Sequence, residues 1–480
     1  MIDPVRNPED TKMRRTLLAL ICLLAVMFVL LSGWAAYLTL GRDTQTMQTE
    51  PTHTTAPTTE PTTQPTTAPT TAPTEPPLDT EAIIAELSAM TQDAEPQLLR
   101  WILATLGEDT LLDLQKTFRD GYDRTDWYSS TGNTLTVLRD VFTGAAETAD
   151  NIHLVSLNIP GEKQQTTTLI FGGDICLADN YLPVKHMAST GHSIDTCIDP
   201  ALVQIMRDAD VTFLNNEFTI SDRGVPMAGK TYTFRAATAN TAWYQTLGVD
   251  IVSLANNHAF DFGEDAFLDT LDTLKSYGIA QVGGGRNLEE AQTIQYYIVN
   301  GRKIAYVAAT RAEKYIMTPA AGENSPGVLR CYDTALTEAA IREAKANSDF
   351  VVACIHWGTE YSYTLEKDQI DSARLYIDAG ADVIVGAHAH QLQGIEDYNG
   401  KPIFYNLGNF WFNAYDIDTG LLQVQITPEG EAVYTFLPAL QKDCHTTTQI
   451  GTDYGASILA TLRQYSINTT IDEKGIVTEK

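Results

Sequence analysis

Apolar runs alternate with amphipathic stretches through the last two thirds of the chain. Short apolar runs of the kind that form buried strands lie at 168–172, 211–214, 250–254, 303–308, 350–355 and 382–385. Between them, at 264–277, 334–346 and 367–379, apolar residues recur with the spacing of a helix face. Strands that alternate with helices are typical of a parallel sheet with crossover helices. We therefore predict an α/β domain over residues 166–440, with further strands at 403–406, 421–426 and 432–436.

We treat residues 441–480 as a C-terminal extension of this domain. On its N-terminal side, residues 78–150 have a purely helical pattern. Apolar residues there share helical faces. They are Ile83, Ile84 and Leu87, followed by Leu98, Leu99, Ile102, Leu103 and Leu106. Because no cluster of catalytic residue types falls in this region, we predict a small helical module.

The N-terminal 40 residues have the pattern of a membrane anchor. Basic residues fall within residues 1–15, and residues 16–40 carry no charge. A helix of about 20 apolar residues crosses a bilayer, and basic residues before the span place the N-terminus in the cytoplasm. A cleaved signal peptide is the alternative, but its apolar core is usually shorter. We predict an uncleaved signal anchor in the cell membrane, with the bulk of the chain extracytoplasmic.

The segment at 41–77 is a low-complexity linker. From Thr44 to Pro77 it contains 15 Thr and 8 Pro, with a recurring TTxP repeat. Such a segment has little apolar surface to bury, and its prolines favour extended geometry. We predict a disordered stalk between the membrane and the folded region.

The charge and composition restrict which ligands the chain can bind, and they say little about its fold. With 32 basic and 61 acidic residues, the net charge is −29, while 44% of residues are hydrophobic. Phosphate contacts need Lys and Arg, so the composition excludes a general nucleic-acid binder. Six cysteines without a CxxC pair are too few for a disulfide scaffold and argue against a thiolate zinc site.

Polar residues follow five of the predicted strands at their carboxyl ends, where an open α/β sheet binds its ligands. They are Asp174; Glu217; Asn256, Asn257, His258 and Asp261; His356, Glu360 and Tyr361; and His388 with His390. Two carboxylates, an amide and several imidazoles form a mixed ligand set that suits Mn, Fe, Zn or Mg. The sequence therefore predicts a divalent metal site with one or two ions.

Each of these residues also has a structural interpretation when taken alone. Asp174 can cap the next helix, Asn257 can be a turn residue, and His356 can be a core histidine. An extended HxH pair places both imidazoles on one side, which favours metal binding by His388 and His390. The coincidence of five strand ends favours the metal site over five unrelated structural roles.

Five short segments carry a resemblance to the CapA family of poly-gamma-glutamate capsule biosynthesis proteins, a family similar to the calcineurin-like metallophosphoesterases. They are GD at 173–174, NNE at 215–217, SLANNHAFDFG at 253–263, IHWGTEY at 355–361 and GAHAHQLQGIEDYNGKPIFYNLGNF at 386–410. The resemblance covers about residues 167–415. It implies a metallophosphoesterase-like, four-layer α/β/β/α sandwich with a two-metal site at the strand ends.

The resemblance also implies roles for individual residues. The metal ligands would be Asp174, Glu217, Asn257, His356, His388 and His390. His258 would act beside the substrate as general acid or transition-state donor. Asp261 can orient His258 or cap the following helix. Contacts with substrate are expected from Asn256, Glu360, Tyr361 and Asn409, and Lys230 and Arg235 are further candidates for an anionic substrate.

Three motifs depart from the usual metallophosphoesterase pattern, and one of them is the fifth motif, which reads GAHAH and still offers two His. Cys176 stands where the first motif usually has His, and Glu217 replaces the usual bridging Asp. Cys176 can be a soft ligand or a small buried residue that fills space.

Three functions fit these observations. The first is a metal-dependent hydrolase or transferase in the biosynthesis of poly-gamma-glutamate or another envelope polymer. The second is a phosphoesterase for an envelope phosphoester, and the third is an assembly subunit with reduced catalysis, which Cys176 favours. The expected partners are the membrane, an anionic polymer and other capsule-synthesis membrane proteins. Because the chain and such a polymer are both polyanions, their contact would need local cations or bridging metal ions.

Overall fold

The computed structural model describes the chain from residue 78 onward, with four internal gaps. The described ranges are 78–90, 96–119, 151–156, 165–312 and 317–480. The predicted cytoplasmic tail, signal anchor and linker lie outside these ranges, so they stay predictions. Among the described helices, none is long and apolar enough to span a bilayer.

Three helices form the described part of the predicted helical module. They are α2 (Thr80–Met90), α3 (Pro96–Leu106) and α4 (Glu108–Arg119). Their apolar faces meet in a small core of their own, which includes Leu87, Leu99 and Leu114. Arg100 of α3 pairs with Glu81 of α2 at 2.8 Å on the surface. The remainder of that module, at 120–150, lies outside the described residues.

A ten-stranded sheet is the larger of two sheets in the α/β region. Its strands are β2 (Thr167–Ile175), β3 (Val211–Asn216), β6 (Ile251–Ser253), β7 (Ala280–Val282), β16 (Asn409–Trp411), β17 (Ile417–Ile426), β18 (Ala432–Lys442), β19 (His445–Thr448), β20 (Thr469–Ile471) and β21 (Ile476–Glu479). The order is β20-β21-β18-β17-β2-β3-β6-β7, with β16 beside β2 and β19 beside β18. From β2 to β7 neighbouring strands run parallel.

The second sheet has seven strands. They are β1 (Ile152–Leu154), β9 (Gln295–Val299), β10 (Arg302–Thr310), β12 (Phe350–His356), β13 (Val383–Ala387), β14 (Ile395–Tyr398) and β15 (Lys401–Phe404). The order is β1-β9-β10-β12-β13-β15-β14, and β10, β12, β13 and β15 run parallel. Two short sheets pair β4 (Thr219–Ile220) with β5 (Arg235–Ala236), and β8 (Gly284–Gly285) with β11 (Gly327–Val328).

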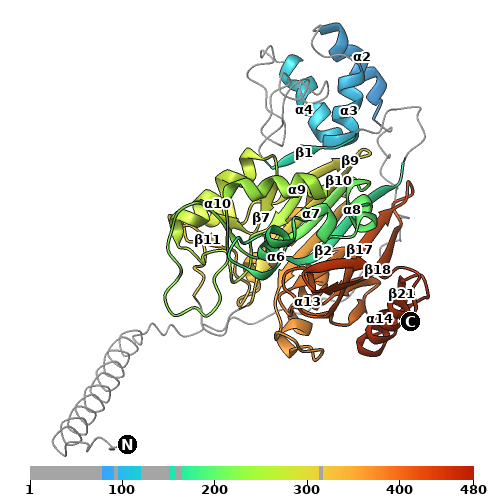
Figure 1. The fold of residues 1–480 in the computed structure, drawn as a ribbon. Coiled ribbons are helices and arrows are strands. Elements are labelled where there is room, and N and C mark those ends of the chain that lie inside the picture. The colour runs from blue at the N-terminus through green and yellow to red at the C-terminus, as the bar shows by residue number, and fades with distance from the viewer. Residues whose placement is uncertain (1–77, 91–95, 120–150, 157–164, 313–316) are drawn as a thin grey trace, which may run out of the picture. The chain divides into compact units, whose positions relative to one another are not determined.

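Helices cover the outer face of each sheet (Figure 1). The ten-stranded sheet is covered by α6 (Leu182–Thr190), α7 (Ile194–Cys197), α8 (Pro200–Arg207), α9 (Ala242–Leu247) and α10 (Glu264–Ser276). The seven-stranded sheet is covered by α12 (Ala335–Ala346) and α13 (Lys367–Ala379). The remaining described helices are η1 (Thr238–Thr241), α11 (Leu288–Ala291) and α14 (Asp453–Tyr465).

Alternation of side chains along the strands builds the layers. Phe171 of β2 faces the core between the two sheets, whereas its neighbour Ile170 faces the helices. In β12, Val352 faces the inter-sheet core and Val351 faces α12 and α13. Successive side chains of a strand point to opposite faces, so each central strand is apolar on both. The result is four layers: helices, sheet, sheet, helices.

The predicted strands and helices of the α/β region are all present, within a few residues of their predicted bounds. Several short strands were not predicted from the sequence, among them β7, β9 and β16. Residues 441–480 contribute β19, β20, β21 and α14. Val477 of β21 and Ile458 of α14 lie in the core between the sheets. That segment is therefore part of the same folded body.

Candidate metal centre

The parallel strands of both sheets deliver polar side chains to one point. Asp174 near the end of β2 lies in register with Asn215 of β3 and Asn409 of β16. His356, the last residue of β12, lies in register with Ala387 of β13. Asn215 Nδ2 lies 3.2 Å from His356 Nδ1, so the carboxyl ends of the two sheets meet here.

The six side chains that the resemblance implies as ligands are all present at this point. Asp174, Glu217, Asn257, His356, His388 and His390 are each at most 8% exposed. Burying so many polar groups in one place costs free energy unless they are paired or hold an ion.

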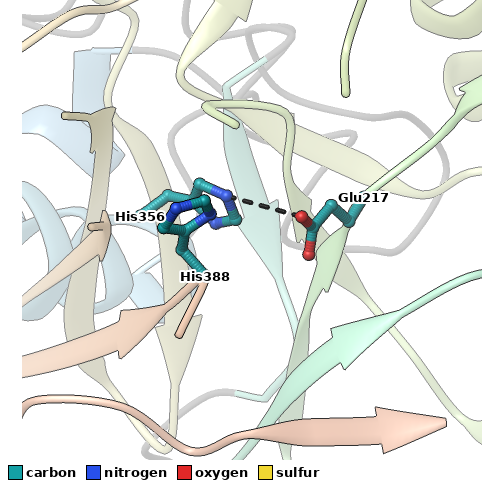
Figure 2. Close-up of side chains that lie close together, drawn as sticks. All are labelled: Glu217, His356 and His388. Carbon is teal, nitrogen blue, oxygen red and sulfur yellow. Dashed lines mark ion pairs between the residues drawn. The ribbon is translucent and has the colours of Figure 1, made fainter. Parts of the chain in front are cut away.

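Glu217 lies at the middle of the group. Its Oε1 is 3.6 Å from His356 Nε2, 3.6 Å from His390 Nε2 and 3.9 Å from His258 Nε2. Figure 2 shows its carboxylate directed at His356 with His388 beside it. Within the described residues, neither carboxylate oxygen of Glu217 has a hydrogen-bond partner. A fully buried carboxylate without a donor is expensive, and a cation between these groups would satisfy it.

Two overlapping ligand groups share Glu217. Glu217, His356 and His388 form one, and Asp174, Glu217 and His390 form the other. In each group the ligand atoms lie within 4.8 Å of one another. Asn257 Oδ1 lies 2.8 Å from His356 Nε2 and so adjoins the first group. The residues present therefore fit one or two divalent ions, with Glu217 between them.

Hydrogen bonds fix the orientation of two ligands. Asn215 Nδ2 donates to Asp174 Oδ1 at 2.8 Å, and Asn409 Oδ1 lies 2.7 Å from His390 Nδ1. Because an amide oxygen only accepts, Nδ1 of His390 carries the proton and its Nε2 faces Glu217. An imidazole held this way through its other nitrogen is typical of metal sites.

The backbone of the GAHAH segment is strained. His388 and His390 have φ of 92° and 55°, a region that side chains other than glycine rarely adopt. The segment is thus a turn, not the extended strand considered for an HxH pair. Gly386 is required because a Cβ there would lie 1.9 Å from the Tyr405 carbonyl oxygen. Both imidazoles nevertheless reach the centre, with ring centroids 6.0 Å apart.

His258 is held by a pair of charged residues. Its Nδ1 lies 2.7 Å from Asp261 Oδ2, and Asp261 Oδ1 lies 2.8 Å from Lys230 Nζ. The N-cap of α10 is Gly263, and no side chain caps that helix end. The geometry therefore favours Asp261 as the residue that orients His258, leaving Nε2 directed at Glu217. Lys230 also donates to the carbonyl oxygen of Asn257.

Burial and neighbouring charges shift the pKa values in opposite directions. Burial, then the charge of Asp174, raises the pKa of Glu217 well above 4.5. Burial, then His390, lowers the pKa of His388 to about 3, and burial also lowers the pKa of His356. Burial lowers the pKa of His390 too, but its bonds to Asp174 and Asn409 outweigh this and raise it. The centre thus offers neutral imidazoles at His356 and His388, beside a Glu217 carboxyl group whose protonated form is favoured by burial.

The residues expected to contact substrate fall into two groups. Glu360 and Tyr361 are exposed, and the Tyr361 ring lies 5.9 Å from the His390 ring. Asn256 and Asn409 are fully buried. Asn256 bonds the Asn216 carbonyl at 2.8 Å and the His258 amide at 2.9 Å, which uses both ends of its side chain. In the structure, the side chains of Asn256 and Asn409 therefore bond other groups of the protein and hold them in position.

Cys176 and Arg235 lie apart from the ligand groups. Cys176 is buried in the core beneath the helices, and burial raises the pKa of its thiol well above 9. Cys176 belongs to neither ligand group and lies among apolar core residues, so the space-filling interpretation fits the structure better. Arg235 bonds the carbonyl oxygens of Arg223 and Gly224 and lies over the Phe262 ring.

Asn215 and several aromatic residues were not predicted as parts of the site. Asn215 links Asp174 to His356, and its place two residues before Glu217 was the available signal. Phe234 and Phe412 pack on His258 and His390, with ring centroids 4.6 Å and 4.7 Å apart. Nothing local in the sequence distinguishes these aromatics from core residues.

Comparison with known proteins identifies a family. The model of the family described as "Bacterial capsule synthesis protein PGA_cap" matches residues 168–414, which contain all six candidate ligands.

Two similar proteins have names that refer to PGA or capsule biosynthesis. The PGA biosynthesis protein CapA of Bacillus subtilis (strain 168) is 33% identical over 273 residues, covering 56% of this chain and 70% of that protein. The capsule biosynthesis protein CapA of Bacillus anthracis is 32% identical over 224 residues, covering 45% of this chain and 52% of the relative. The chain thus spans about half the length of the second relative. Among solved structures, TT1561 of Thermus thermophilus aligns over 54% of this chain and 94% of its own, with a TM-score of 0.30 and 11% identity, too low to carry an argument.

Proposed function

The chain belongs to the bacterial capsule synthesis protein PGA_cap family, and we propose that its buried centre is a metal-dependent hydrolase or transferase site acting in poly-gamma-glutamate or related envelope-polymer biosynthesis. Two relatives named for PGA or capsule biosynthesis support the process. The geometry of the centre supports the chemistry.

One observation carries the metal part of the proposal. Glu217 is fully buried, lacks a hydrogen-bond donor among the described residues, and has the Nε2 atoms of His356 and His390 each 3.6 Å away. A structural glutamate in such a place would be paired. Glu217 is arranged instead to share a divalent ion with the imidazoles on either side.

The chain's ligands divide between two positions. Asp174, Glu217 and His390 would hold one ion; Glu217, His356 and His388, with Asn257 beside them, would hold the other. Mn, Fe, Zn and Mg are the candidates for this mixed nitrogen and oxygen set. Bound there, a divalent ion supplies Lewis acidity and makes a bound water acidic enough to serve as a nucleophile near neutral pH.

His258 is the residue we assign to proton transfer. Asp261 holds its Nδ1, and Lys230 balances the charge of Asp261. The Nε2 of His258 is therefore presented to a reacting group at the centre, where it can give or accept a proton. Asp261 also stabilises the imidazolium that forms when His258 takes a proton.

The four observed layers, with the centre at the strand ends of two facing sheets, are the arrangement that a metallophosphoesterase-like fold implies. This supports, as part of the proposal, a displacement at phosphorus or attack on an amide carbonyl as the reaction class. Cys176 supports a second candidate. Because it lies in the apolar core outside both ligand groups, one metal position lacks a ligand that the usual pattern supplies, and an assembly subunit with reduced catalysis would tolerate that loss.

We also propose that residues 16–40 anchor the chain in the cell membrane with the folded region outside. The uncharged run and the basic residues before it support this. Protease added to intact cells should remove the folded region. A folded region that stays protected until the cells are lysed would contradict this location.

Metal analysis of the purified full-length protein tests the site. We expect one or two divalent ions per chain, and strong loss of metal in His388→Ala and His390→Ala. His445→Ala is the matched control, because His445 lies in β19, outside the ligand groups. A parent protein without affinity for any of the four metals would contradict the proposal.

Two substrates then separate the reaction classes. Turnover of an aryl phosphate supports a phosphoesterase, and turnover of a gamma-glutamyl peptide supports action on the polymer. A metal-loaded protein that turns over neither would favour the assembly subunit.

A further inference from the structure

Four tyrosines from separate parts of the chain gather beside the centre. Tyr181, Tyr232, Tyr361 and Tyr415 are here called the tyrosine group. The rings of Tyr361 and Tyr415 lie 6.5 Å apart. Burial raises the pKa of Tyr181, and the other three phenols lie near enough to raise it further.

Two buried phenylalanines connect the tyrosine group to the catalytic histidines. Tyr181 and Tyr232 both contact Phe234, with centroids 4.5 Å and 6.5 Å apart, and Phe234 packs on His258. Phe412 lies 5.8 Å from Tyr181 and 4.7 Å from His390. Phe234 and Phe412 are at most 4% exposed. They form an apolar base between the tyrosines and the ligand groups.

Three members of the tyrosine group are open to solvent although they surround a buried polar centre. Tyr232, Tyr361 and Tyr415 are 62%, 49% and 58% exposed. Tyr361 also has φ of 56°, and its amide donates to the Ala389 carbonyl at 2.8 Å. A non-glycine residue held at positive φ by a backbone bond stores strain, which points to a functional reason for displaying that ring.

The charges that act on Tyr361 are carboxylates. Glu360 directly precedes Tyr361 and is exposed beside it, and the His390 ring that Tyr361 contacts lies next to Glu217 and Asp174. Ions at the centre would balance Glu217 and Asp174, but they would leave Glu360 in place. Among the described residues, no Lys or Arg stacks on a ring of the tyrosine group.

We propose that the tyrosine group binds the substrate of the metal centre, and that the bound segment is an uncharged, polyhydroxylated chain of the carbohydrate class. This inference rests on the proposed function, because it names the ligand of that same centre. Aromatic faces pack on the apolar C–H faces of a sugar ring, while phenol hydroxyls exchange hydrogen bonds with its hydroxyl groups. Tyrosine does both with little loss of conformational freedom.

A run of carboxylates fits this surface less well. Phenols can donate to carboxylates, but Glu360 repels them and the chain carries a net charge of −29. A site built for a polyanion would place Arg or Lys at its edge. Lys230 lies close to the centre, but it is committed to Asp261 and the Asn257 carbonyl.

Calorimetric titration of the full-length protein tests the inference. The probes are an N-acetylglucosamine tetramer and a gamma-linked glutamate tetramer, each added to metal-loaded and metal-free protein. We expect the sugar to bind in both states and more tightly than the glutamate tetramer. Tyr361→Ala should weaken sugar binding by about tenfold, and Tyr361→Phe by less, because it keeps the aromatic face.

Controls keep the result specific. Tyr232→Ala repeats the test at a second exposed ring, should Tyr361→Ala disturb the backbone at Ala389. Tyr454→Ala should leave sugar binding unchanged, because Tyr454 is 46% exposed on α14 and bonds Asp418. Equal sugar affinity in all tyrosine variants, tighter binding of the glutamate tetramer, or binding of neither probe would overturn the inference.

The inference and the proposed function can fail separately. Sugar binding by a protein that never takes up metal would support a carbohydrate site at the tyrosine group, but it would remove the metal-dependent chemistry that this site is proposed to serve. Metal uptake with turnover of a gamma-glutamyl peptide, but without sugar binding, would support the proposed function and overturn the inference.

Discussion

Two glutamates of the α/β region are equally buried and differ in what surrounds them. Glu217 and Glu396 are both 0% exposed. Glu396, in β14, accepts from Arg374 Nη2 at 2.6 Å and from the Tyr405 hydroxyl at 2.6 Å. Glu217 has histidines around it, the nearest nitrogens at 3.6 Å, and among the described groups no donor within hydrogen-bond reach.

The difference separates structure from function. Glu396 is paired within the fold, so its charge supports the native state without any ligand. Glu217 is left incomplete, so its burial destabilises the protein until something positive arrives. A buried polar group without a partner is the better marker of a binding site than burial itself.

The largest expected effect is on metal affinity at Glu217. Glu217→Gln keeps the size of the side chain and removes the charge shared by both ligand groups. A structural Zn²⁺ site of four ligands contributes about 10–16 kcal/mol, or about 3 kcal/mol for each ligand. We therefore expect metal affinity to fall more than about a hundredfold, measured by competition with a fluorescent chelator. Retained affinity would mean that Glu217 is not a ligand.

In the metal-free protein, Glu217→Gln should change how stability depends on pH. The folded-state pKa of Glu217 is raised, so between pH 4.5 and that raised value the folded state binds more protons than the unfolded state. The free energy of unfolding therefore falls as pH rises through this range. Denaturant unfolding at several pH values should show this fall in the parent and a smaller fall in Glu217→Gln.

Removing the partner of Glu396 should lower the free energy of unfolding without changing metal affinity. Arg374→Ala leaves the Glu396 carboxylate with one donor fewer. Because Arg374 is 39% exposed, water can enter, so we expect about 2–3 kcal/mol of destabilisation, at the low end for a broken buried pair. Arg342→Ala is the control, since its pair with Glu338 is on the surface and should matter by less than about 1 kcal/mol. A loss of metal affinity in Arg374→Ala would contradict a purely structural role for Glu396.

A smaller effect is expected from the residue that orients His390. Asn409→Ala removes the oxygen 2.7 Å from His390 Nδ1. Loss of such a partner typically weakens metal affinity by about 10–100-fold. Asn409→Asp, which keeps the acceptor, should recover most of it, and the exposed Asn347→Ala should be neutral. An unchanged affinity in Asn409→Ala would show that packing alone orients His390.

The smallest effect is expected at Cys176. Its thiol is buried in the apolar core and belongs to neither ligand group, so Cys176→Ala should leave the number of bound ions unchanged. The cavity should cost less than about 1.5 kcal/mol of stability. Absorption of cobalt-loaded protein provides the check, because a thiolate ligand gives an intense charge-transfer band. Loss of such a band in the variant would make Cys176 a ligand after all.

Local pattern was enough to predict the strands and the polar residues at their ends, which the structure brings together; that these residues bind metal stays a prediction. Asp174 and His356 terminate apolar runs, and a run of six or seven buried residues is visible in the sequence alone. The division of the strands between two facing sheets was available only from the family resemblance, because which strands pair is a long-range property. The roles of Asn256 and Tyr415 were equally hidden, since they depend on neighbours distant in the chain. Local conformation also misled at His388 and His390, where an extended pair was considered and the backbone adopts positive φ instead.

The hydrogen bond from Tyr361 to Ala389 has a thermodynamic consequence. Ala389 lies between His388 and His390, so one backbone segment carries two imidazoles of the centre and anchors the strained Tyr361. An ion that fixes the position of this segment would also fix Tyr361, and a ligand packed on Tyr361 would restrain the two histidines. Such coupling is reciprocal: whatever factor the ion adds to the affinity for the ligand, the ligand adds to the affinity for the ion. If the coupling is favourable, a loaded site would then hold its metal more tightly while the polymer is bound.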